Sequence, residues 1–118
     1  MTMDARKALL IDAYRRFNGR DVEGLLSMMT DDVEWPDVLN QKVLRSKDAI
    51  REYWLGQFAV GDPQVVPMDF EPGTVDDEIV AVVEQEVRGL GGDVLVERRE
   101  VRHRYWFRDG LVRRMVVE

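Results

Sequence analysis

The chain has 118 residues, of which 45% are hydrophobic and 34% charged, as in a globular domain and unlike a disordered segment. Cysteine is absent, which excludes disulfides and thiolate metal sites, and the net charge of −6 argues against a nucleic-acid partner. The N-terminus lacks a signal-peptide pattern, and no apolar run approaches the roughly 20 residues that span a bilayer. We therefore expect a single cytoplasmic domain over residues 1–118, without a membrane partner.

Helical periodicity marks three segments in the first half of the chain. Asp4 to Asn18 carries one apolar stripe, and Asn18-Gly19 can end that helix. A second helix is predicted after Asp21, an N-cap residue, and a third after Ser46. The apolar positions of these two helices are Val22, Leu25, Leu26 and Met29, then Ala49, Ile50, Tyr53, Trp54 and Phe58.

The rest of the chain is predicted to form strands. A short strand over Asp32 to Trp35 stops at Pro36, between the second and third helices. The later strands are Gln64 to Phe70, Glu78 to Arg88, Asp93 to Arg108 and Leu111 to Val117. Short turns such as Asp109-Gly110 join them, which predicts an antiparallel meander.

The two faces of the longest predicted strand differ in character. Successive side chains of a strand point to opposite faces, so alternate residues share an environment. One face carries Val101, His103, Tyr105 and Phe107, and the other carries Arg102, Arg104, Trp106 and Arg108. We expect the first set on a buried concave face and the second on an outer face, partly covered by arginine stems.

Four local motifs occur in an order that is similar to one superfamily. They are Ala13 to Asp21, Met28 to Trp35, Ser46 to Trp54 and Tyr105 to Val112. Together they resemble the nuclear transport factor 2-like superfamily, which includes ketosteroid isomerases and SnoaL-like polyketide cyclases. The resemblance implies an α+β, cone-shaped domain with three N-terminal helices packed on the concave face of a curved antiparallel sheet. It also implies an apolar interior and a homodimer through the outer sheet face, where Trp106 lies among arginines.

Two residues could carry acid–base chemistry. The resemblance places His103, the only histidine, where ketosteroid isomerases carry a pocket-facing acid. It places Tyr14 where those enzymes carry the tyrosine of their oxyanion hole. An imidazole can act as general acid or base, and a phenol in an apolar cavity can polarise a carbonyl. The structural alternatives are a hydrogen-bonded wall histidine and a core tyrosine.

The general base of the ketosteroid isomerases has no direct counterpart. Its place before a proline is taken by Trp35, which cannot move a proton, so Asp37 is the candidate that would have to reach the pocket. A cyclase or dehydratase would need a carboxylate beside the histidine, and Glu84, Glu86 and Asp37 are open alternatives. The Arg-x-Asp arrangement of the limonene epoxide hydrolases is missing from the valine-rich strand.

The expected pocket lining is aromatic. Its candidate substrate-binding residues are Trp35, Tyr53, Trp54, Phe58, Tyr105, Phe107 and Met115. No spacing of ligands predicts a metal site, and no glycine-rich loop precedes a helix, so no cofactor is expected. The sequence thus favours an isomerase, cyclase or dehydratase that acts on an apolar carbonyl or hydroxyl compound. The alternative is a non-catalytic ligand-binding or dimerisation module of the same fold.

Overall fold

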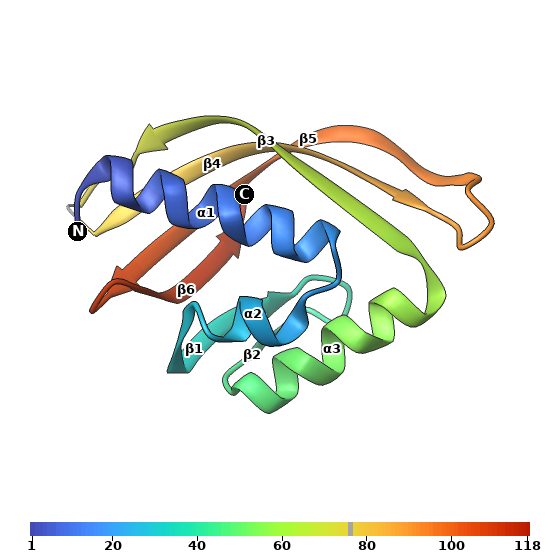
Figure 1. Cartoon of the computed structure of the whole chain (residues 1–118), viewed down its shortest axis with the longest axis horizontal. Coiled ribbons are helices and arrows are strands. Elements are labelled where there is room, and N and C mark those ends of the chain that lie inside the picture. The colour runs from blue at the N-terminus through green and yellow to red at the C-terminus, as the bar shows by residue number, and fades with distance from the viewer. Residues whose placement is uncertain (76) are drawn as a thin grey trace.

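Three helices and six strands make up the part of the chain that the computed structural model describes, residues 1–75 and 77–118 (Figure 1). In chain order they are α1 (Met3–Asn18), α2 (Val22–Leu26), β1 (Met29–Asp37), β2 (Lys42–Leu44), α3 (Lys47–Val60), β3 (Asp62–Pro72), β4 (Glu78–Arg88), β5 (Val94–Arg108) and β6 (Leu111–Val117).

Each helix begins at a side-chain cap. The Thr2 hydroxyl accepts a hydrogen bond from the backbone N–H of Ala5, and the Ser46 hydroxyl accepts one from Ala49, both at 3.1 Å. The Asp21 carboxylate accepts one from Gly24 at 3.0 Å. Caps of this kind satisfy N–H groups that have no partner within the helix. The starts of α2 and α3 agree with those predicted from Asp21 and Ser46.

Helix α2 is shorter than its periodicity predicts. It ends at Leu26, and Met29 begins β1 instead of extending the helical stripe. The backbone N–H of Val112 donates to the carbonyl of Met28 at 2.9 Å, and Met29 pairs with Val112 in the register of β6. Pairing with a strand more than eighty positions away therefore decides where α2 ends. The local periodicity of the sequence does not predict this pairing.

The six strands form one curved sheet in the order β2-β1-β6-β5-β4-β3. Strands β3 to β6 make the predicted antiparallel meander. Strand β1 pairs in parallel with β6, whereas the sequence predicted an entirely antiparallel sheet. The three-residue strand β2 forms an antiparallel hairpin with β1. The parallel pairing is possible because a long connection, made of β2, α3 and β3 to β5, lies between β1 and β6 in the chain.

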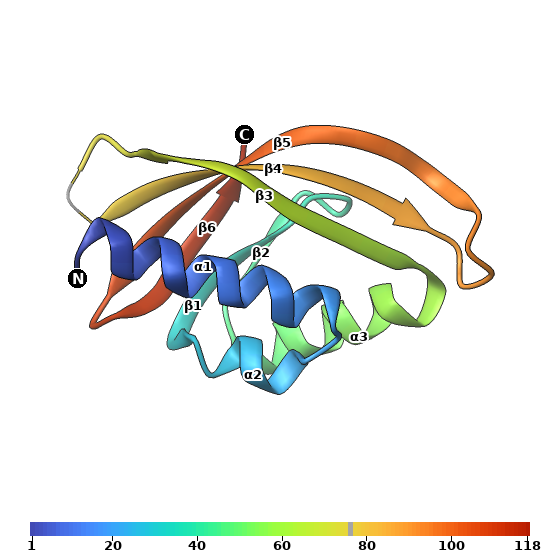
Figure 2. The same cartoon turned by 45° about the horizontal axis from the view of Figure 1, so that its top comes forward.

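The sheet bends over the helices (Figure 2). Register shifts interrupt the pairings β3–β4, β4–β5 and β5–β6, and such bulges increase local twist and bending. All three helices lie on the concave side, as predicted. None of the described helices is long and apolar enough to cross a membrane.

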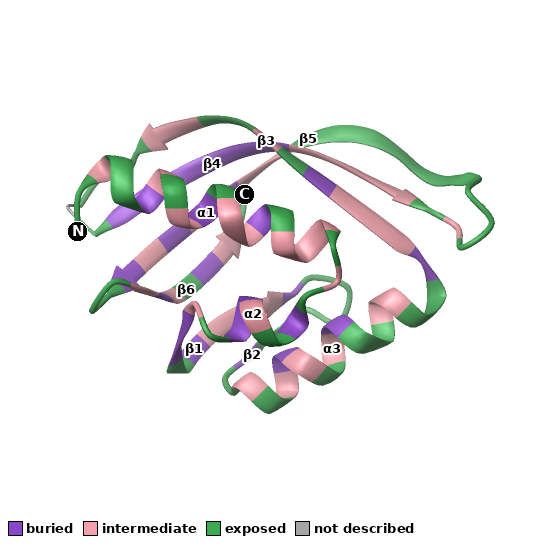
Figure 3. Cartoon of the chain, viewed as in Figure 1, coloured by how far each residue is buried: buried purple, intermediate pink, exposed green. Residues whose placement is uncertain are grey.

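The core lies between the helices and the concave face. Its largest fully buried side chains are Trp54, Leu10, Ile50, Ile79, Val33 and Val83. On β5 the predicted alternation holds, because His103, Tyr105 and Phe107 are buried while Arg102 and Trp106 are only half-buried. The hairpin of β4 and β5 extends past the body of the domain, and the beginning of β5 is exposed (Figure 3).

The outer sheet face is covered by its own charged side chains. Val80 and Val82 on β4 point outward, yet they are only 2% and 6% exposed. Their register partners on β5 are Arg104 and Arg102, whose stems can cover them. Arg104 forms ion pairs with Glu78 and Glu118, and Arg102 pairs with Glu71. Arg114 lies over the Trp106 ring, 4.8 Å from its centroid.

Candidate functional site

A cavity of about 280 Å³ lies between the concave face and the helices. Its walls are mostly apolar and come from all three helices and from β1, β3, β4, β5 and β6. The buried end contains three polar side chains, Tyr14, His103 and Tyr105, which we call the polar triad. At the other end the lining residues are half-buried or exposed, so this end is the mouth. The mouth residues are Val38, Leu39, Tyr53, Gln57, Gln85 and Arg99.

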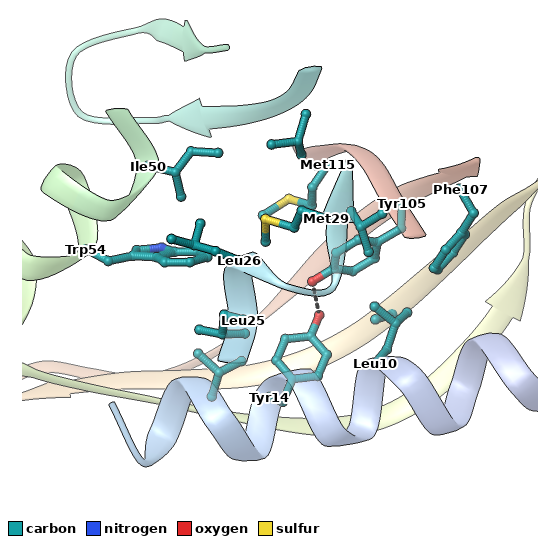
Figure 4. Close-up of a cluster of buried hydrophobic side chains, with 14 of the residues drawn as sticks. Leu10, Tyr14, Leu25, Leu26, Met29, Ile50, Trp54, Tyr105, Phe107 and Met115 are labelled. Atoms are coloured by element: carbon teal, nitrogen blue, oxygen red, sulfur yellow. Dashed lines mark hydrogen bonds between the residues drawn. The ribbon is translucent and has the colours of Figure 1, made fainter. Parts of the chain in front are cut away.

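The polar triad is joined by two buried hydrogen bonds. The hydroxyl of Tyr14 lies 2.9 Å from Nδ1 of His103 and 2.8 Å from the hydroxyl of Tyr105. Figure 4 shows the two tyrosine hydroxyls pointing toward each other from α1 and β5. Tyr14 is therefore the central member of the polar triad, and His103 and Tyr105 lie at its two ends.

Two periodicities bring the triad together. The helical stripe of α1 turns Tyr14, like Leu10 one turn earlier, toward the sheet. The two-residue period of β5 places His103 and Tyr105 on the concave face, one above the other. In the register with β4, His103 faces Ala81, whose side chain is a single methyl group.

Burial keeps the triad uncharged near neutral pH. Loss of water lowers the pKa of His103 from 6.5 to about 4, because the imidazolium is poorly solvated there. Burial also raises the pKa of Tyr14 well above its usual value of 10, and the neighbouring Tyr105 adds to the shift. The pKa of Tyr105 is likewise raised by burial, while its hydrogen bond to Tyr14 opposes the rise.

A neutral triad can arrange its protons in two ways. In the first, Nδ1–H of His103 donates to Tyr14, Tyr14 donates to Tyr105, and the Tyr105 O–H remains available to a ligand. Nε2 then carries a lone pair and can accept a proton. In the second arrangement both bonds run the other way, and Nε2–H becomes the donor. The polar triad can therefore accept a proton at one end and donate one at the other end without gaining a net charge.

Aromatic rings form much of the wall next to the triad. The Trp35 and Trp54 rings meet edge to face, with centroids 5.3 Å apart. The Trp35 ring is also 6.4 Å from the Tyr105 ring. Tyr53 lies nearer the mouth, where Gln57 donates a hydrogen bond to its hydroxyl at 3.1 Å. Burial and the charge of Asp37 raise the pKa of Tyr53.

Asp37 is buried at the end of β1, outside the cavity lining that its neighbours Pro36 and Val38 join. Its carboxylate accepts hydrogen bonds from the backbone N–H of Asn40 at 3.2 Å and from the Asn40 side chain at 2.8 Å. These bonds close the turn between β1 and β2. The structure thus does not bring Asp37 to the triad, because the turn already uses both of its oxygens.

Two predicted wall residues also lie outside the lining. Phe58 packs edge to face on Phe17, with centroids 5.3 Å apart, and the Arg20 guanidinium covers it at 4.3 Å. Phe107 is buried beside Arg6, whose guanidinium carbon is 5.9 Å from the ring centroid. Trp35, Tyr53, Trp54, Tyr105 and Met115 do line the cavity, together with Tyr14 and His103.

Several lining residues were not anticipated from the sequence. The Tyr105 hydroxyl belongs to the triad, although Tyr105 was expected only as a wall aromatic. Arg99 is two positions before Val101, so the alternation of β5 already put it on the cavity side. Gln85 lies opposite Arg99 in the register. No sequence signal indicated Leu39, which the β1–β2 turn brings to the mouth.

The lining provides proton donors and acceptors but, within residues 1–75 and 77–118, no Asp or Glu. In the same described residues no group of three or more His, Cys, Asp and Glu side chains is arranged to hold a metal ion. The groups of the described lining that can move or donate a proton at its buried end are one imidazole and two phenols.

The model of one protein family, described as the SnoaL-like domain, matches residues 10–115. The chain belongs to this family. The match and the solved structures below confirm the predicted resemblance to the nuclear transport factor 2-like superfamily. Among curated proteins, none matches the chain significantly.

Three solved structures show how closely this SnoaL-like chain follows known folds. TerC, co-crystallised with polyporic acid, is 27% identical, with a TM-score of 0.79 over 97% of this chain and 89% of that one. SalBIII, an epoxide hydrolase/cyclase-like enzyme of pyran ring formation in salinomycin, is 18% identical, with a TM-score of 0.78 over 95% and 88%. The Δ5-3-ketosteroid isomerase of Mycobacterium sp. is 20% identical, with a TM-score of 0.77 over 94% and 89%. The last two likenesses establish the fold alone.

Proposed function

We propose that this SnoaL-like protein is a cofactor-independent acid–base enzyme. Its substrate is an apolar compound with a carbonyl or hydroxyl oxygen, and the reaction is an isomerisation, cyclisation or dehydration. The proposal rests on one observation: three hydrogen-bonded proton donors and acceptors lie at the buried end of an apolar cavity. Perturbed titratable groups in such a cavity are typical of active sites.

Enolisation of a ketone illustrates how the triad would act. Nε2 of His103 removes a proton from the carbon next to the carbonyl, and the electrons of the C–H bond form the C=C bond of the enol. The carbonyl oxygen takes the proton of the Tyr105 O–H. Tyr105 recovers a proton from Tyr14, and Tyr14 recovers one from Nδ1 of His103. Return of a proton to a different carbon completes an isomerisation, and the imidazole stays neutral throughout.

The environment of the triad favours this relay over a stepwise transfer of charge. A stepwise reaction would leave an imidazolium beside an enolate, and ions are poorly solvated among the buried aromatic walls. The His103 pKa of about 4 reflects the same cost. A relay through Tyr14 moves protons at both ends of the substrate, so that charge never accumulates. Hydrogen bonds in a low dielectric also polarise one another, which assists such a transfer.

Proton exchange tests the proposal without knowledge of the natural substrate. A panel of small polycyclic ketones and terpenoids is incubated in D2O, and deuterium uptake next to the carbonyl is followed by NMR. We expect wild type to catalyse uptake, and His103→Gln and Tyr14→Phe to lower the rate by about 100-fold or more, the usual contribution of acid–base groups. Trp106→Phe, which alters the outer face beside Tyr105, is the matched control. Exchange that survives both triad substitutions would refute the mechanism.

A non-catalytic binding module is the second candidate. It is favoured by the lack of any Asp or Glu among the described lining residues and by the weak basicity of His103. Such a module would bind members of the same panel through the apolar walls, with the triad donating one hydrogen bond to the ligand oxygen. Binding without deuterium uptake at any pH would select this candidate.

We also propose that two copies associate through the outer sheet face. Trp106 and the arginines on this face are residue types that are enriched at protein interfaces. The face is also broad, since β3, β4, β5 and β6 all contribute to it. The rival is a monomer in which Trp106 stays beneath Arg114 and the ion pairs of Arg102 and Arg104 remain in water.

A further inference from the structure

Arg99 differs from the other arginines of the β4–β5 hairpin. Arg88 forms an ion pair with Glu86 at 2.8 Å, and Arg98 forms one with Glu84 at 3.4 Å. Arg99 forms no ion pair with any residue in the part of the chain that the structure describes, although the protein carries a net charge of −6. Its side chain instead lines the cavity at the mouth.

The surroundings of Arg99 can hold an anion. Gln85, its register partner on β4, also lines the mouth and offers an amide N–H₂. Among the described lining residues there is no carboxylate that would neutralise the guanidinium. A guanidinium and an amide side by side match the geometry of a carboxylate, which a guanidinium can bind through two parallel hydrogen bonds.

From this arrangement we infer that the ligand is an elongated apolar acid. Its anionic group binds Arg99 and Gln85 at the mouth, and a carbonyl or hydroxyl oxygen at its other end reaches the polar triad. This inference rests on the proposed function and adds a substrate class to it. The apolar body lies along Val101, the residue between Arg99 and His103 on the cavity side of β5.

The strand sets the length of such a ligand. Arg99 and His103 are four residues apart on β5, which corresponds to about 13 Å at the usual rise of a strand. Three or four fused rings with an oxygen at one end and a carboxylate at the other match this span. A monocyclic acid would reach only one of the two polar ends, so the separation selects against it.

Two matched probes test the inference. The first is 3-oxoandrost-4-ene-17β-carboxylic acid, which has a ketone and a carboxylate at opposite ends of a rigid polycycle. The second is its 17β-carboxamide, which has nearly the same shape and no charge. Titration calorimetry would give both dissociation constants for wild type, Arg99→Gln and Arg98→Gln. The Arg98 variant loses the same charge from the same hairpin but outside the lining, so it controls for long-range electrostatics.

We expect the acid to bind wild type and Arg98→Gln about five- to tenfold more tightly than the carboxamide. In Arg99→Gln this preference disappears because only the acid loses affinity. Added salt reduces the preference, since Arg99 is exposed. Equal binding of both probes to wild type would overturn the anion site and leave the proposed function standing. If neither probe binds wild type, the polycyclic ligand of the proposed function is refuted as well.

Discussion

The hydroxyl of Tyr14 on α1 and Nδ1 of His103 on β5 lie 2.9 Å apart, although 89 positions separate the two residues in sequence. The bond joins the first helix to the longest strand across the buried end of the cavity. Both groups are polar and both are buried, so Nδ1 of His103 depends on Tyr14 for its hydrogen-bond partner, while Tyr14 also bonds to Tyr105. One contact thus contributes to the docking of α1 and shapes the chemistry of the site.

Acid is expected to destabilise the protein through His103. Its pKa is about 4 in the folded state and 6.5 ordinarily. Between pH 4 and pH 6.5 His103 is therefore mostly protonated in the unfolded chain and mostly neutral in the folded protein. The free energy of unfolding therefore falls as pH is lowered from 6.5 to 4, by about 3 kcal/mol in total. Urea unfolding of wild type and His103→Gln, at pH 7 and pH 4.5, measures this contribution.

Carboxylates titrate in the same pH range, so the contribution of His103 is obtained from the difference between wild type and His103→Gln. Wild type should lose about 2–3 kcal/mol more than His103→Gln over this interval, because only wild type has the imidazole. Equal losses would mean that His103 is protonated in the folded protein without penalty and is therefore well solvated.

The central place of Tyr14 in the triad predicts unequal costs for two similar substitutions. Tyr14→Phe removes both hydrogen bonds and leaves His103 and Tyr105 without their partner, so we expect a loss of about 2–3 kcal/mol. Tyr105→Phe removes one bond and leaves Tyr14 paired with His103, so about 1 kcal/mol is expected. Thermal and urea unfolding of both variants would give the order. A greater loss in Tyr105→Phe would contradict the arrangement.

Filling the cavity separates a pocket function from a purely structural one. In Val101→Phe a larger side chain would occupy the space between the mouth and the triad. We expect ligand affinity to fall at least tenfold, while the free energy of unfolding changes by about 1 kcal/mol or less, because empty volume accepts the ring. Calorimetry with a polycyclic ketone and urea unfolding measure the two effects. Strong destabilisation would show that side chains already fill this space, since overpacking costs about 1–3 kcal/mol.

The proposed homodimer can be tested at Trp106. Light scattering of wild type at micromolar concentration should give twice the monomer mass. Trp106→Lys should give a monomer, because a second cation beside Arg114 would be buried against the partner without a counter-charge. The spectrum of the variant in the far ultraviolet should stay unchanged, as Trp106 lies outside the core. A monomeric wild type would refute the dimer.

The periodic signals of the sequence were sufficient to predict most of the elements. Capping residues Asp21 and Ser46 predicted where α2 and α3 begin, because caps act within one turn. The bounds of β4 and β6 agree with their predicted ranges, since turn residues flank both strands. The alternation along β5 also predicted which side chains face the cavity. These features all depend on contacts between residues close in sequence.

The sequence predicted only part of the candidate site. The resemblance pointed to Tyr14 and His103, but it could not supply the hydroxyl of Tyr105 as the third member of the chain. Nor could it show that Asn40 occupies both oxygens of Asp37, because that turn forms only when β2 folds back on β1. The sequence shows which chemical groups are present, whereas the hydrogen bonds of the folded protein show which of these groups are free to react.

The sequence by itself determined most of the helices and strands and the buried face of β5, because short-range periods of 3.6 and 2 residues encode them. Its local motifs, by resemblance, indicated the family. Only the tertiary structure decided that β1 would pair in parallel with β6, ending α2 early, and that α1 would bring Tyr14 against His103. It also decided that Arg98 would pair with Glu84, while Arg99 forms no ion pair with the described residues. The physical reason is the same in each case: these contacts join residues far apart in sequence, and their partners are selected by packing.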